Sequence, residues 1–203
     1  MGVDEELVAL PAPPRGRRLL SMASMVAVIV AAAGLLVHLR ADVAYSFADA
    51  RVSDLGEVTA VDLAELEPNR YVRVRGTPML SRMVRFERAI SGQRYAVFPL
   101  AGQRQIFVQV SLEALVDPSR ASQGEFSGRL LTFGQLGGRF QVVREYLRRD
   151  LNLPVTAESF VVLAEEPPSA YGWALGMSAL CLAVIALMGA LLLRWFRPLA
   201  AAA

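Results

Sequence analysis

Two long, uncharged apolar stretches bracket the chain, at residues 19–39 and 170–193. Each has enough residues to cross a hydrocarbon layer of about 30 Å as an α-helix. The segment between them mixes charged and apolar residues, as a soluble domain does. The sequence therefore predicts a membrane-anchored α+β protein in which two transmembrane helices flank one small domain.

Arginines mark the outer ends of both stretches: Arg15, Arg17 and Arg18 before the first, and Arg194 and Arg197 after the second. Basic residues near span ends favour the cytoplasmic side of a membrane, although Arg40 opposes this assignment. All basic residues are arginine and alanine is abundant, which is typical of a GC-rich bacterial genome. We therefore expect a bacterial inner-membrane protein with both termini cytoplasmic and the central domain periplasmic. The first stretch exceeds a typical signal-peptide core of 7–15 residues, so we expect an uncleaved anchor.

The expected organisation has six parts. They are a cytoplasmic tail (1–18), a transmembrane helix (19–39), a stalk helix or linker (40–60), a periplasmic domain (61–168), a second transmembrane helix (170–193) and a cytoplasmic tail (194–203). The helical spacing of Ala44, Phe47 and Leu55 predicts that the first helix continues as a stalk until Gly56.

Short alternating or β-rich runs separated by turn residues predict strands in the central segment. The expected strands are Tyr71–Thr77, Val84–Glu87, Arg94–Leu100, Ile106–Val110, Glu125–Phe133 and Ser159–Ala164. Short helices are expected after Asp62, after Ser111 and at 140–151. The number and order of these elements predict a small OB-like β-barrel. Glu165 and Glu166 are interpreted as a solvated linker to the second span.

The chemistry available to the central domain is narrow, because residues 40–168 contain no histidine, cysteine or lysine. This excludes a serine–histidine triad, a cysteine nucleophile, a Schiff-base lysine and a His/Cys zinc site built from this domain alone. No cofactor or metal ion is predicted. His38 is either a polar residue at a span end or a contact to a cofactor of another subunit. Cys181 lies within the second span, where it is interpreted as a packing residue.

Charge excludes one class of partner and points to another. Arginines and acidic residues balance within residues 40–168, whereas a nucleic-acid-binding domain shows a basic excess. The densest basic stretch is either a surface for an acidic partner or lipid headgroups, or a set of solvated strand faces. Its residues are Arg73, Arg75, Arg82, Arg85 and Arg88.

Small residues recur along one face of the second span and would let another helix approach closely. They are Gly172, Gly176, Ala179, Ala183, Ala186 and Ala190. We expect this face to pack the two spans together or to dock onto a larger membrane protein.

The layout of a soluble domain between two spans resembles that of the Surfeit-type cytochrome oxidase assembly factors. The sequence thus favours a non-enzymatic accessory subunit or assembly factor of a larger membrane complex, with a respiratory complex as the candidate that this layout suggests. Its expected partners are other membrane proteins and the lipid bilayer. The alternative is an envelope enzyme that acts on lipid or polymer through a metal ion or through converging carboxylates such as Glu87, Glu125 and Glu145.

Overall fold

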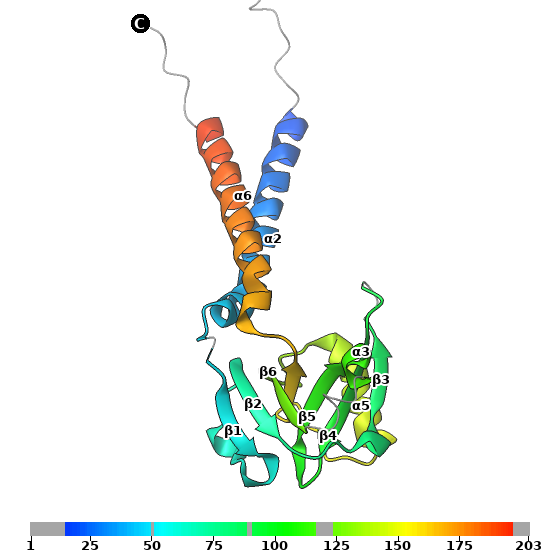
Figure 1. Cartoon of the computed structure of the whole chain (residues 1–203). Helices are drawn as coiled ribbons and strands as arrows, with labels where there is room; N and C mark the ends of the chain where they lie inside the picture. The colour runs from blue at the N-terminus through cyan, green and yellow to red at the C-terminus, as the bar shows by residue number, and fades with distance from the viewer. Residues whose placement is uncertain (1–14, 50, 89–90, 117–123, 197–203) are drawn as a thin grey trace, which may run out of the picture. The chain divides into compact units, whose positions relative to one another are not determined.

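The computed structural model describes residues 15–49, 51–88, 91–116 and 124–196, which fall into two compact units (Figure 1). One unit contains the greater parts of two long helices, α2 (Arg15–Ser46) and α6 (Gly172–Phe196). The other comprises residues 41–173 and contains a seven-stranded sheet.

Both long helices meet the requirements for crossing a membrane. Their apolar segments, Leu19–Ser46 and Pro168–Trp195, each have 28 residues and a mean hydropathy of 2.4. Leucine and valine side chains are exposed along both helices, including Leu20, Val30, Leu182 and Leu193. Such exposed apolar surface is expected of a helix whose environment is lipid or another apolar helix. The structure thus supports the two predicted spans by length and composition.

The predicted stalk helix is shorter than expected, because α2 ends at Ser46 rather than at Gly56. The residues after it form strand β1 (Ser53–Glu57), which pairs in parallel with β2 (Arg70–Arg75). Gly56 has φ of 73°, a left-handed conformation that suits glycine and interrupts the β1 register. Pairing with β2 makes residues 53–57 a strand despite their helical spacing. The sheet therefore begins before residue 61, where the domain was expected to start.

The sheet is open and mixed, with strand order β1-β2-β6-β7-β5-β4-β3. Its remaining strands are β3 (Val84–Glu87), β4 (Arg94–Leu100), β5 (Gln103–Ser111), β6 (Glu125–Thr132) and β7 (Phe160–Ala164). The closed barrel expected from strand number is wrong, because β1 and β3 remain at the two edges of the sheet. Each strand inferred from sequence is present to within a few residues.

Apolar cores lie on both faces of this sheet. Phe98, Val108 and Leu130 belong to one core, while their chain neighbours Val97, Phe107 and Leu131 belong to the other. Helix α5 (Gly138–Arg149) covers the second face with Phe140, Val143 and Leu147. The first face is covered by the short segments η1 (Val58–Ala60), η2 (Leu63–Glu65) and α3 (Leu112–Val116).

Strand β7 shows why a central strand is a continuous apolar run. Val161, Val162 and Leu163 are all buried, because both faces of the sheet are covered at this point. The neighbouring strand β6 approaches so closely that a Cβ atom on Gly128 would lie 1.9 Å from the carbonyl oxygen of Leu163. Only glycine fits there, so this residue sets the spacing between β6 and β7.

Candidate functional site

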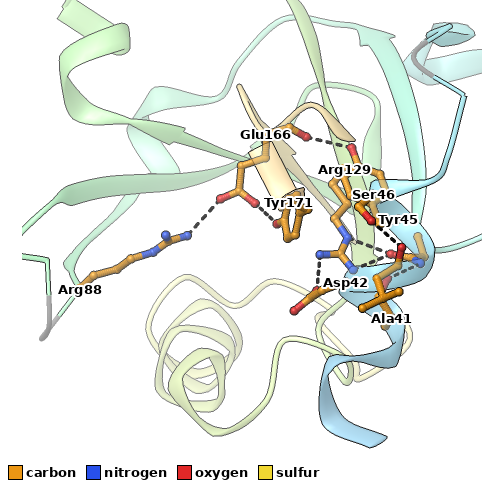
Figure 2. Close-up of polar contacts among 10 residues, drawn as sticks. Ala41, Asp42, Tyr45, Ser46, Arg88, Arg129, Glu166 and Tyr171 are labelled. Carbon is orange, nitrogen blue, oxygen red and sulfur yellow. Dashed lines mark hydrogen bonds and ion pairs between the residues drawn. The ribbon is translucent and has the colours of Figure 1, made fainter. Parts of the chain in front are cut away.

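Arg129 is the one charged residue that the structure buries among the residues it describes, with 3% of its surface exposed. It lies on β6 between the apolar residues Leu130 and Gly128. A buried charge is costly unless it is paired and hydrogen-bonded. The neighbours of Arg129 therefore show what the fold uses this charge for (Figure 2).

The guanidinium of Arg129 donates to two side chains from distant parts of the chain. Its Nη1 lies 2.6 Å from Oδ1 of Asp42, near the end of α2. Its Nε and Nη2 lie 2.8 and 2.6 Å from Oδ1 of Asn69, just before β2. Asn69 Nδ2 in turn donates to the carbonyl of Ala41 at 3.0 Å. The end of α2, the start of β2 and the middle of β6 are thus joined through one cation.

Two tyrosine rings flank the same guanidinium. The Cζ atom of Arg129 lies 4.6 Å from the ring centroid of Tyr45 and 4.4 Å from that of Tyr171. The two rings also contact each other edge-on, with centroids 5.0 Å apart. Tyr45 is fully buried. A cation over an aromatic face gains most when water is excluded, as it is here.

Glu166 connects this cluster to Arg88, the residue after the edge strand β3. Its backbone carbonyl accepts a hydrogen bond of 2.8 Å from the Tyr45 hydroxyl, and its carboxylate accepts one from the Tyr171 hydroxyl. The second carboxylate oxygen lies 3.2 Å from Nη2 of Arg88, whose guanidinium stacks at 4.3 Å on Tyr95. The prediction that Glu166 belongs to a solvated linker is therefore wrong.

Backbone geometry holds the same segments in place. Asn69 and Glu165 both adopt left-handed conformations, with φ of 67° and 66°. A glutamate in this region is strained and persists only where its surroundings fix it. The amide of Glu165 donates to the carbonyl of Ser127 at 3.1 Å, and its carboxylate accepts from Ser111 at 3.0 Å. These contacts attach the segment after β7 to β5 and β6.

We call this set of residues the Arg129 cluster: Asp42, Tyr45, Asn69, Arg88, Arg129, Glu166 and Tyr171. Each polar head in it already has a protein partner within the cluster. Its aromatic faces are occupied by Arg129 itself. The arrangement can hold the two segments next to the apolar helices firmly on the sheet.

The predicted arginine surface is divided between two strands at separate places in the sheet order. On β2, Arg73 pairs with Glu125 at 3.0 Å and Arg75 pairs with Asp54 at 2.5 Å. Arg82 and Arg85 are exposed in η3 (Leu80–Arg82) and β3. Arg88 belongs to the Arg129 cluster. The role of these arginines as one interaction surface stays a prediction.

Asp54 shows how such a surface pair is held. The backbone amide of Gly56 and then the Arg75 guanidinium donate to its carboxylate, and together they lower the pKa of Asp54. Hydrogen bonds to the charged form favour that form.

The predicted small-residue face of α6 is exposed at all six positions, Gly172, Gly176, Ala179, Ala183, Ala186 and Ala190. The buried residues of α6 are Ala174 and Cys181, which lie on a different face. The use of the six small residues in packing the two helices together stays a prediction. Their use as a contact for another membrane protein stays a prediction. His38 is exposed on α2, and its contact with a cofactor of another subunit stays a prediction.

The three acids proposed for an enzyme lie on three different elements. Glu87 is on β3, Glu125 on β6 and Glu145 on α5, and the last two pair with arginines. Within the described ranges, no group of three His, Cys, Asp or Glu residues could hold a metal ion. The enzyme alternative stays a prediction.

Sequence reasoning missed the Arg129 cluster, although two signals for it were present. Arg129 precedes the apolar residues Leu130 and Leu131 in a predicted strand, where its charge would be buried. A buried charge needs an ion pair or hydrogen bonds. Asn69 lies in the turn Glu-Pro-Asn-Arg, and asparagine tolerates the left-handed conformation found there. The identities of the partners could not be inferred, because Asp42 and Tyr171 are far from Arg129 in sequence.

The comparisons with known proteins add no relative: no protein-family model, no curated protein and no solved structure matches this chain.

Proposed function

We propose that this protein is a membrane-anchored, non-enzymatic accessory subunit or assembly factor of a larger membrane complex. Its sheet unit binds the partner, and its two apolar helices hold that unit at the membrane. A respiratory complex is the partner class that the layout favours. The likeness of the sheet unit to OB-like domains stays a prediction within this proposal.

The Arg129 cluster is the observation that carries the proposal. The buried cation and its tyrosine, asparagine and carboxylate partners satisfy one another rather than lining an open cleft. They attach the segments at both ends of the sheet unit to β6. Firm attachment at both ends suits a domain that must present a fixed surface to a neighbour in the membrane.

The proposed location is the bacterial inner membrane, with both termini cytoplasmic and the sheet unit periplasmic. The arginines outside each apolar stretch support this orientation. The unit contains no cysteine, so single cysteines can be introduced at Arg85 or Gln141 after Cys181→Ala. In intact cells, a periplasmic unit should react with a membrane-impermeant maleimide. Labelling only after lysis would refute the orientation.

The proposed function is tested by purifying the tagged full chain from its native membranes in mild detergent. We expect it to migrate in native gels with a stoichiometric set of membrane proteins that mass spectrometry identifies. Deleting its gene should lower the level or activity of that complex. A chain that purifies alone at physiological expression, with all membrane complexes unchanged in the deletion strain, would refute the proposal.

A further inference from the structure

Two exposed aromatic residues lie where the chain passes between the sheet unit and the apolar helices. Phe47 directly follows the end of α2 and is 72% exposed, and Trp173 is the second residue of α6 and is 54% exposed. Both belong to the sheet unit, which extends from Ala41 to Trp173. A buried aromatic side chain removes about 150–250 Å² from contact with water. Two such rings left exposed would therefore gain stability from a neighbouring apolar environment.

Tyr45 and Tyr171 hold these two positions close to each other within the sheet unit (Figure 2). Their rings contact edge-on with centroids 5.0 Å apart, and each ring belongs to the residue two positions before one of the exposed aromatics. The Tyr45 hydroxyl also donates to the carbonyl of Glu166 at 2.8 Å. Phe47 and Trp173 are therefore fixed beside one point of the sheet unit.

The apolar run after Trp173 has the length that places this residue at a membrane boundary. Residues 174–193 contain no charged residue, and Arg194 and Trp195 follow them. At 1.5 Å per residue they form a helix of about 30 Å, which is the thickness of the hydrocarbon core of a bilayer. Tryptophans thus lie at both ends of the run, and tryptophan is enriched at both membrane–water interfaces.

We propose that Phe47 and Trp173 lie in the headgroup layer of the bilayer and form the surface through which the sheet unit contacts lipid. The contact between Tyr45 and Tyr171 keeps Phe47 near the depth of Trp173. This inference rests on the membrane anchoring in the proposed function. It does not depend on which complex the protein joins.

The charges near the two aromatic residues give no reason for an anionic lipid. Residues 40–51 contain Arg40 and Arg51 against Asp42 and Asp49, so their formal charges cancel. Residues 165–173 contain two glutamates and no basic residue. An anionic headgroup is attracted by clustered Lys or Arg. The aromatic rings are therefore expected to supply the contact, and a neutral bilayer should suffice.

Fluorescence of single tryptophans in the purified full chain tests this placement. The chain has two tryptophans, so Trp195→Phe leaves Trp173 as the only reporter. Phe47→Trp in a chain that also carries Trp173→Phe and Trp195→Phe reports on the other position. The matched control is Leu80→Trp in the same background, because Leu80 is an exposed apolar residue of η3 and is distant in sequence from both helices. Each chain is inserted into phosphatidylcholine nanodiscs that hold a single copy, so that no other protein can cover the reporter.

Two kinds of quencher distinguish lipid from water. Nitroxide-labelled phosphatidylcholine quenches a tryptophan that contacts lipid, and iodide quenches one that contacts water. A nitroxide on the headgroup should lower the emission of Trp173 and of the Phe47→Trp reporter about twofold, as expected for interfacial aromatic residues. A nitroxide in the middle of an acyl chain should lower it less, and iodide should have little effect. The Leu80→Trp control should be quenched by iodide and not by either lipid.

Three results would overturn the inference. They are iodide quenching of either reporter as strong as that of Leu80→Trp, stronger quenching from the acyl chain than from the headgroup, and quenching by neither lipid nor iodide, which would mean that protein covers the residue. Trp195, left alone by Trp173→Phe, separates these failures from a failure of the proposed function. If lipid quenches Trp195 but not the two reporters, the membrane anchoring stands and this inference fails. If lipid does not quench Trp195 either, the anchoring in the proposed function fails first.

Discussion

Replacing Arg129 by glutamine should release the segments at both ends of the sheet unit. The variant loses the ion pair to Asp42, two hydrogen bonds to Asn69 and the contacts to two tyrosine rings. Removing one partner of a buried pair costs about 3–5 kcal/mol, and each desolvated cation–π contact contributes up to about 2 kcal/mol. These values overlap because the groups form one network, so we expect a total loss of about 3–5 kcal/mol.

Hydrogen exchange of the full chain in detergent measures this loss locally. In Arg129→Gln, amides of residues 41–46 and 165–171 should exchange roughly two to three and a half orders of magnitude faster, since 1.4 kcal/mol is about tenfold. Amides of β4 and β5 should change less if the core stays folded. Arg85→Gln, an exposed arginine on β3, is the matched control and should leave both segments unchanged.

The double variant Arg129→Gln/Asp42→Asn tests whether the ion pair accounts for most of the lost stability. If it does, adding Asp42→Asn to Arg129→Gln should lower the free energy of unfolding little further, because the pair is already broken. The reasoning is refuted if Arg129→Gln changes exchange in the two segments by less than about fivefold, which corresponds to about 1 kcal/mol.

Three further outcomes are expected. Gly128→Ala should lower the thermal stability of the sheet unit severely or prevent folding, because the new Cβ atom would overlap the Leu163 carbonyl, whereas Gly138→Ala should be neutral or mildly stabilising in the same melting assay. Leu147→Ala should cost about 2–5 kcal/mol in denaturant unfolding, since its side chain is fully buried between α5 and the sheet; a loss near zero, as at an exposed residue, would contradict this burial. The folded-state pKa of Asp54 is lowered, so its stabilising effect is present above its ordinary pKa and is lost as pH falls through the folded pKa. Asp54→Asn should therefore be less stable than wild type at neutral pH and equal to it at strongly acidic pH; a difference that persists in acid would refute the assignment.

The strands and α5 were predictable because their signals are local. Alternation in Val72–Val74 and the apolar run Val161–Leu163 reflect which faces of a strand are covered. Helix α5 follows from the helical spacing of Phe140, Val143 and Leu147. Strand β1 was not predictable in this way, because Ser53–Glu57 has no apolar pattern of its own and is a strand only through its pairing with β2.

The two apolar helices, their flanking charges and most of the strands follow from local sequence, since each depends on residues close together in the chain. Long-range contacts determine that the sheet stays open, that Arg129 joins Asp42, Asn69 and two tyrosines, and that Val142 and Tyr146 of α5 are exposed. Burial of a charge and pairing of strands depend on which distant segments come into contact, and no short sequence pattern specifies those contacts.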